Sequence, residues 1–184
     1  MTYRWIYKTP DGFEDLLLIS DGEFLTALLF LHTAAAEEHR EGQEENLPVF
    51  RQTARWLDEY FSGRQPSFMP SYKILNLTPF RQEVIDIMLS VPFGETITYG
   101  GIAAKIAKAH GMKRMSAQAV GGAVGWNPLC ILIPCHRVIG ADGSLTGYGG
   151  GVANKVSLLK LEGHDLNDMI IPKGPDKWTV RNEG

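Results

Sequence analysis

The spacing of apolar and polar residues divides the chain into strand-like and helix-like segments. Three short runs, at residues 3–9, 15–20 and 24–32, are rich in branched and aromatic side chains, and the turn sequences PDG and SDGE separate them. This pattern predicts strands joined by hairpin turns. Residues 34–46 are acidic and carry no apolar stripe, so we expect a solvated loop or a loose helix there.

After this acidic segment the apolar residues adopt helical spacing. Within residues 47–63 they recur at steps of three to four, a proline suits the first turn and a glycine suits the C-terminal cap. Residues 64–77 contain two prolines and are typical of a linker. We therefore predict a structural α+β domain over residues 1–75 and a second domain over residues 76–184. The predicted apolar stripe of this first helix is Phe50, Ala54, Leu57 and Phe61.

The second domain begins with three predicted helices. Thr78 suits the N-terminal cap of a helix that ends before Pro92, and a further helix is expected over Tyr99–Ala109. Ser116 suits the cap of the next helix, and two helices joined by a short basic turn are typical of a helix-turn-helix. The predicted buried residues are Phe80, Val84, Ile87 and Met88 in the first helix and Val120, Ala123 and Val124 in the third.

An apolar run and a glycine-rich run follow these helices. Residues 129–135 (LCILIPC) predict a buried strand, and residues 138–151 predict a glycine-rich hairpin or wing. Residues 152–163 predict a final helix. The tail beyond His164 contains Trp178 and shows no periodicity, so it yields no structural prediction.

Composition and charge narrow the classes of partner. The 184 residues are 44% hydrophobic and 21% charged, as in globular proteins. We expect a cytoplasmic protein, because we find neither a signal peptide nor an apolar stretch long enough to span a membrane. Residues 1–78 carry 7 Lys and Arg against 12 Asp and Glu, whereas residues 95–160 carry 7 against 2. Such a basic region suits a polyanionic partner.

The two cysteines, Cys130 and Cys135, are the first candidates for chemistry. Five residues apart on one strand, they would point to opposite faces, which disfavours a disulfide. They do not form a zinc pattern with the five scattered histidines, so we expect no metal. Cys130 fits a buried structural thiol. Cys135 precedes His136 in a basic region that favours the thiolate, so both a structural thiol and a reactive nucleophile stay open on these residues alone.

The string GWNPLCILIPCHRVIG, followed by GSLTGYGGG and LLKLEG, closely resembles the O6-alkylguanine-DNA alkyltransferases, whose signature is PCHRV. The resemblance is strong over residues 78–163 and extends to the N-terminal domain only in size and in order of elements. It implies a small ribonuclease-H-like N-terminal domain and a winged helix-turn-helix-like C-terminal domain. It further implies transfer of an alkyl group from O6 of guanine in double-stranded DNA to Cys135, once per molecule, by a monomer without a cofactor.

The same resemblance implies four catalytic residues. Cys135 matches the nucleophile, and His136 matches the histidine that takes the thiol proton through a water. Glu162 matches the acid that orients this histidine, which follows the logic of a catalytic triad. Tyr99 matches a tyrosine whose hydroxyl meets N3 of the flipped guanine and makes the base a better leaving group.

The resemblance also implies that the second helix of the helix-turn-helix enters the minor groove and that the guanine is flipped out of the duplex. Gln118 stands where the family usually has an arginine finger, and Gly149 stands where it often has a serine. Asn127 matches a hinge asparagine, and Tyr148 matches a residue of the loop that covers the base. The positions implied to bind DNA or the base are Ser116, Ala117, Gln118, Ala119, Asn127, Arg137, Val138, Tyr148, Gly149 and Lys155.

The basic connection before this helix, KAHGMKRM, is longer than the spacing common in the family. Its cationic side chains and their neighbour Lys105 suit phosphate contacts that would offset the missing arginine. The set comprises Lys105, Lys108, Lys113 and Arg114.

Two other functions compete with this interpretation. The first is an alkyltransferase-like module that binds DNA lesions with weak or no transfer, although such proteins typically replace the cysteine that this chain keeps. The second is a thiol hydrolase or redox enzyme that uses Cys135 and His136, for which a basic helix-turn-helix has no purpose.

Overall fold

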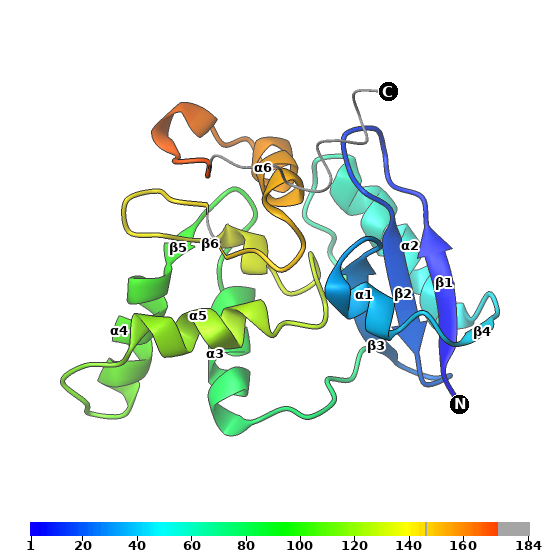
Figure 1. Cartoon of the computed structure of the whole chain (residues 1–184), viewed down its shortest axis with the longest axis horizontal. Coiled ribbons are helices and arrows are strands. Elements are labelled where there is room, and N and C mark those ends of the chain that lie inside the picture. The colour runs from blue at the N-terminus through cyan, green and yellow to red at the C-terminus, as the bar shows by residue number, and fades with distance from the viewer. Residues whose placement is uncertain (146, 173–184) are drawn as a thin grey trace. The chain divides into compact units, whose positions relative to one another are not determined.

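The computed structural model describes residues 1–145 and 147–172. The chain divides into two compact units. The first comprises Met1–Asn76 and the short segment Pro128–Leu132, and the second comprises Leu77–Asn127 and the chain from Ile133 onward. Figure 1 labels the helices and strands of each unit. The tail around Trp178 lies outside the described residues.

The first unit contains a four-stranded sheet in the order β3-β2-β1-β4. β1 (Tyr3–Tyr7), β2 (Leu16–Ser20) and β3 (Leu25–Phe30) are antiparallel neighbours, which confirms the three predicted strands. β4 (Gln43–Glu44) pairs in parallel with β1. Sequence reasoning missed β4 because its two residues are polar and exposed, so no apolar alternation marks it.

The strands β2 and β3 of this sheet are buried on both faces. Every residue of β2 and β3 is buried, as expected for strands covered from two sides. On one face, Leu17 and Ile19 of β2 pack in a cluster with Ala36 of the short helix α1 (Ala34–Glu38). For the acidic segment, where a solvated loop or a loose helix was predicted, the structure thus has a short helix at its start.

The helix α2 (Pro48–Phe61) packs against the sheet of the first unit, as Figure 1 shows. The predicted helix is confirmed, but its buried face is rotated from the predicted stripe. Trp56 and Tyr60 are 2% and 0% exposed and stack at 5.5 Å between ring centres, whereas Ala54 and Phe61 are half-buried. The rotation follows from size, because two large aromatic rings bury far more apolar area than an alanine.

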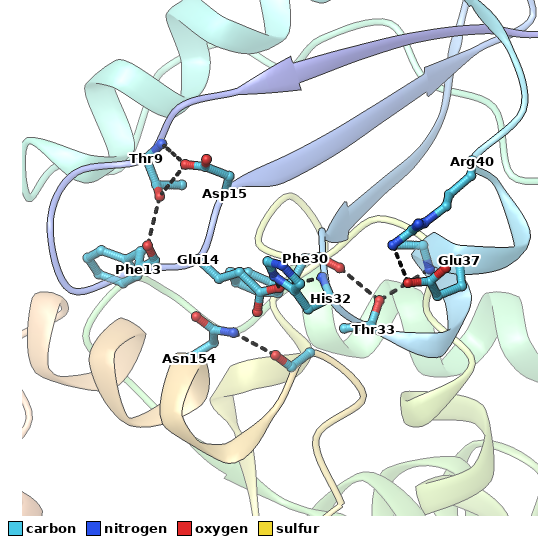
Figure 2. A network of polar contacts seen from close by, with 12 residues as sticks. Thr9, Phe13, Glu14, Asp15, Phe30, His32, Thr33, Glu37, Arg40 and Asn154 are labelled. Atoms are coloured by element: carbon cyan, nitrogen blue, oxygen red, sulfur yellow. Dashed lines mark hydrogen bonds and ion pairs between the residues drawn. The ribbon is translucent and has the colours of Figure 1, made fainter. Parts of the chain in front are cut away.

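Polar contacts fix the loops at the ends of β2 and β3 (Figure 2). The buried carboxylate of Glu14 accepts hydrogen bonds from the backbone N–H and the imidazole of His32. Asp15 accepts from the backbone N–H of Thr9 at 3.1 Å, and the Thr33 hydroxyl caps α1. A carboxylate taken out of water is tolerated only with such partners, so these bonds set the path of the loops.

Two other segments pair with the outer edge of β3. The Leu25 N–H donates to the Ser71 carbonyl at 2.9 Å, and the Leu28 N–H donates to the Pro128 carbonyl at 2.8 Å. Part of the predicted linker, around Ser71, therefore belongs to the first unit. The predicted strand over residues 129–135 is wrong, because only the region of Leu129 pairs with β3, in an isolated bridge.

The second unit contains three packed helices, α3 (Pro79–Leu89), α4 (Tyr99–Ala109) and α5 (Ala117–Gly125). Thr78 caps α3 by accepting from the Arg81 N–H, and Ser116 caps α5. These caps and the α4–α5 helix pair confirm the predicted helix-turn-helix. The predicted buried residues of α5 are confirmed as well, whereas α3 buries Val84, Ile85 and Met88 and leaves Phe80 and Ile87 half-buried.

The rest of the second unit joins short strands to a final helix. β5 (Ile97–Thr98) pairs in parallel with β6 (Val138–Ile139). The predicted last helix is α6 (Val152–Leu161), and the 3-10 turn η2 (Leu166–Asp168) follows it. In the described part of residues 138–151, predicted as a hairpin or wing, the Gly140 N–H donates to the Ser144 carbonyl at 2.8 Å and closes a turn. The flanking residues do not pair as a two-stranded hairpin, because β6 pairs with β5 and Ser144 pairs with Ile170. No helix within the described residues is both long and apolar enough to cross a bilayer.

We expect Thr78→Ala to lower the free energy of unfolding of the second unit by about 1 kcal/mol, because it removes the side-chain cap of α3. Urea denaturation followed by circular dichroism measures the loss. Thr78→Ser keeps the hydroxyl and is the matched control. An alanine variant as stable as the serine variant would contradict the role of the cap.

Candidate active site

Cys135 begins the 3-10 turn η1 (Cys135–Arg137) and does not end a strand. The preceding residue, Pro134, has φ −80° and ψ 63°, and the Cys135 N–H donates to the Ile133 carbonyl at 2.8 Å. These values define an inverse γ-turn, which the restricted φ of proline favours. The thiol is buried, with 5% of the residue exposed. The predicted burial is therefore confirmed, and the predicted strand is replaced by two consecutive turns.

A strained turn lies four residues before the thiol. Ile131 has φ +70°, and the Leu132 N–H donates across it to the Cys130 carbonyl at 2.8 Å. A β-branched residue rarely adopts positive φ, and such a conformation costs on the order of 1–3 kcal/mol. Ile131 is also buried, which offsets this cost.

Asn127 links the end of α5 to the chain that carries the thiol. Its side-chain amide donates to the Ile133 carbonyl at 2.9 Å, and the residue is buried. Ile133 is also the acceptor of the Cys135 N–H. This geometry agrees with the hinge position that the sequence resemblance implied for Asn127.

The carboxylate of Glu162 binds both residues that follow Cys135. Its Oε1 lies 2.7 Å from His136 Nε2, and Arg137 donates Nε to Oε2 and Nη2 to Oε1, each at 2.9 Å. Arg137 also donates Nη1 to the Val91 carbonyl at 2.7 Å. The side chains of His136 and Glu162 are 0% exposed. The fold therefore brings together His136 and Glu162, which are 26 residues apart in sequence.

The charges of this cluster set the protonation of His136. Burial would raise the pKa of Glu162, but the hydrogen bonds and charges of His136 and Arg137 outweigh it and lower that pKa to about 2. Burial lowers the pKa of His136 below its usual value; Glu162 opposes the shift, and Arg137 and Lys155 add to it. The imidazole is therefore neutral at neutral pH and able to accept a proton beside an ionised carboxylate.

Lys155 and Tyr99 interact electrostatically with Cys135. Burial lowers the pKa of Lys155 to about 8, and the negative charge of Cys135 as thiolate opposes this shift. Burial raises the pKa of Tyr99, and the same charge adds to it. The Lys155 ammonium donates to the Val138 carbonyl at 2.6 Å and lies 5.7 Å from the centre of the Tyr148 ring. At neutral pH a mostly protonated amine and a protonated phenol thus neighbour the thiol.

The outer face of α5 consists of small or uncharged residues. A Cβ built on Gly122 or Gly125 would meet nothing within 4 Å, so packing within the described residues does not require glycine at these positions. A Cβ on Gly121 would lie 3.8 Å from the Tyr99 ring. The predicted DNA-binding residues on this face are all exposed: Ser116, Ala117, Gln118 and Ala119.

The structure places the remaining predicted binding residues in two environments. Tyr148 is half-buried and Gly149 is exposed in the loop before α6. Arg137 and Val138 are buried, so the Arg137 guanidinium binds Glu162 and the Val91 carbonyl and does not face outward. Sequence reasoning missed this position of Arg137. The apolar residues after Arg137 were the signal that its side chain is buried. A buried arginine requires a carboxylate partner, and Glu162 supplies it.

Comparison with known proteins agrees with the fold and identifies the family. Residues 2–69 match the family model of the 6-O-methylguanine DNA methyltransferase ribonuclease-like domain, and residues 79–164 match the model of the DNA binding domain of the same enzymes. A methylated-DNA–protein-cysteine methyltransferase of Methanosarcina acetivorans is 40% identical over 162 residues, covering 88% of this chain and 98% of the relative. The one from Haemophilus influenzae is 37% identical, covering 87% and 86%.

Solved structures show the same similarity. A Mycobacterium tuberculosis O6-methylguanine methyltransferase superposes with a TM-score of 0.74 at 37% identity, covering 88% of this chain and 93% of the other. A structure of the M. tuberculosis protein in complex with DNA gives 0.70 at 36% identity, covering 88% and 91%. The fold and these relatives together define a two-domain DNA-repair protein that acts by alkyl transfer. The chain belongs to the methylated-DNA–protein-cysteine methyltransferase family, which confirms the resemblance found in the sequence.

We expect the stability that Glu162 provides to be sensitive to acid. Its pKa in the folded chain, about 2, lies below the ordinary 4.5, so the carboxylate stabilises the fold above pH 4.5 and this contribution is lost as the pH falls toward 2. The whole shift corresponds to roughly 3 kcal/mol, of which about 2 kcal/mol is lost by pH 3. The difference in free energy of unfolding between wild type and Glu162→Gln should therefore be about 2 kcal/mol larger at pH 6 than at pH 3.

Urea denaturation at the two pH values measures this difference. Glu95→Gln, at an exposed position of the same unit, is the matched control and should show no such change. A difference in free energy of unfolding between wild type and Glu162→Gln that is equal at both pH values would contradict the lowered pKa of Glu162.

Proposed function

We propose that this chain repairs O6-alkylguanine in double-stranded DNA by moving the alkyl group to the sulfur of Cys135, once per molecule. DNA repair by alkyl transfer is the activity of the family to which the chain belongs. The observation that carries the assignment to Cys135 is the buried cluster of His136, Arg137 and Glu162 that directly follows the thiol. Such a cluster generates a thiolate in a site that lacks bulk water.

The first step of the proposed reaction is removal of the thiol proton. His136 is held at Nε2 by Glu162, and its Nδ1 accepts the proton through a water. The lowered pKa of His136 keeps the imidazole neutral before the reaction, and the Glu162 carboxylate stabilises the imidazolium that forms. Arg137 keeps that carboxylate ionised and oriented.

The second step is displacement at the alkyl carbon. Cys135 Sγ forms a bond to this carbon while the bond from carbon to O6 breaks and its electron pair passes to the guanine ring. The Tyr99 hydroxyl, which its raised pKa keeps protonated, donates a hydrogen bond to ring N3 and stabilises the negative charge that develops on the guanine, and the proton held by His136 balances that charge. The Lys155 ammonium stabilises the thiolate before attack. No later step removes the alkyl group from the sulfur of the thioether product. The reaction is therefore stoichiometric, and it needs no cofactor.

DNA approaches, in this proposal, on the exposed face of α5. Its small side chains permit close contact with the minor groove, and the guanine leaves the stack because its O6 substituent is inaccessible within the duplex. Gln118 fills the position of the extruded base, and the exposed Lys108, Lys113 and Arg114 add phosphate contacts. The preference for O6-alkylguanine, a monomeric state and a cytoplasmic location are parts of the same proposal.

We expect intact-mass spectrometry to show the gain of one methyl group after incubation with duplex DNA containing O6-methylguanine, with the modified peptide containing Cys135. Cys135→Ser should abolish the gain and still bind DNA, because α5 is unchanged. Cys130→Ser is the matched control, since Cys130 is also buried and should leave transfer intact. Binding without any mass gain in the wild type would favour the alternative of a lesion-binding module.

We expect Gln118→Arg to tighten binding of duplex DNA by roughly threefold to tenfold at low salt and to speed transfer, because it adds a charge and a planar group at the proposed extrusion position. Fluorescence anisotropy and single-turnover transfer measure the two effects. Gln43→Arg, on the exposed strand β4, adds the same charge elsewhere as a control. An unchanged or slower transfer rate would count against Gln118 at this position.

A further inference from the structure

We propose that Asn154 and residues 165–170, which we call the C-terminal strap, hold residues 147–151 from both ends and thereby position this covering loop for alkyl transfer. The inference rests on the proposed function and assigns to Asn154 and to the strap a positioning role. The family model matches residues 79–164, so the strap lies beyond the matched region.

The strap is bound to the chain just before the covering loop. The Ile170 N–H donates to the Gly143 carbonyl, and the Leu145 N–H donates to the Ile170 carbonyl, each at 3.0 Å. Gly143 has φ +85°, and a Cβ on it would lie 2.8 Å from the Asp168 carbonyl oxygen. The two backbones therefore approach so closely that only glycine fits. Leu145, 0% exposed, ends this anchored stretch.

Asn154 holds the other end of the covering loop. It is 0% exposed, and its amide donates to the Gly150 carbonyl at 2.8 Å, a contact that is dashed in Figure 2. The Gly151 N–H donates to the Tyr148 carbonyl at 3.1 Å, and Gly151 is the N-cap residue of α6. Lys155, next to Asn154, carries the ammonium beside Cys135, so the anchor and the amine belong to the same helical turn.

Between these anchors the covering loop meets the groups that surround the thiol. A Cβ on Gly147 would lie 3.6 Å from the Tyr99 hydroxyl, and one on Gly149 would lie 3.6 Å from the Gly125 carbonyl. The Tyr148 ring lies 5.7 Å from the Lys155 ammonium. A glycine-rich loop loses much conformational entropy when it becomes ordered. Contacts at both of its ends therefore reduce the free energy that binding of the base has to supply to order it. Displacement of a positioning element by about 1 Å costs up to 100-fold in rate.

The experiment compares full-length variants in single-turnover transfer from duplex DNA containing O6-methylguanine. Ile170→Pro removes the N–H that binds Gly143, and Ile171→Pro places the same residue one position later as the matched control. Asn154→Asp removes the amide donor at nearly constant volume. At saturating DNA we expect Ile170→Pro and Asn154→Asp to transfer about tenfold more slowly than wild type and Ile171→Pro to match wild type.

Two parallel measurements separate positioning from a merely structural role. DNA affinity by anisotropy should change less than twofold, and the thermal midpoint of each variant should stay above the assay temperature. Truncation after His164 removes the strap without any substitution, and truncation after Pro172 is its control. This pair of truncations tests the positioning role of the strap if a point variant unfolds. The proposal is overturned by wild-type rates in the strap variants and in Asn154→Asp, or by weaker DNA binding with an unchanged saturating rate. Failure of the wild type to transfer at all would overturn the proposed function instead.

Discussion

The carboxylate of Glu162 is buried at the end of α6 and binds the two residues that follow Cys135 in the chain. A buried charge is stable only when its partners are in place, and loss of one partner of such a pair costs about 3–5 kcal/mol. The contact therefore joins α6 to η1, and the bond from Arg137 to the Val91 carbonyl extends it to the chain after α3. The position of the thiol depends on this three-way junction.

Burial, aided by the charges of Arg137 and Lys155, explains how His136 stays neutral beside an ionised glutamate. A carboxylate alone would favour the imidazolium, but burial and the charges of Arg137 and Lys155 act in the opposite direction. In the proposed reaction, His136 is thus unprotonated beforehand, while the charge that stabilises its protonated form is already oriented. Preorganisation of this kind leaves little rearrangement for the moment of transfer.

Two kinds of residue surround the thiol in the second unit. Cys135, His136 and Glu162 are buried, whereas the covering loop and the outer face of α5 consist largely of glycine and alanine. Burial suits the proposed proton relay, in which distances decide the rate, and small residues suit the surfaces that a DNA duplex approaches closely in the proposed function. Anchors at both ends of the covering loop hold its small residues in place beside the thiol.

Local interactions determined the elements that the sequence predicted well. The caps at Thr78 and Ser116 lie within three residues of the N–H groups they bind, and the helices they begin agree with the predicted ones. Only the tertiary structure decided the partners of Glu162, which lie 25 and 26 residues away, and the break of the apolar run before Cys135 into turns. That run has the composition of a strand, but pairing at Leu129, the hinge contact of Asn127 and the φ of Pro134 overrode its propensity. The motif PCHRV thus sufficed to propose Cys135 as the nucleophile from sequence alone, whereas the burial of Arg137 against Glu162 followed from packing.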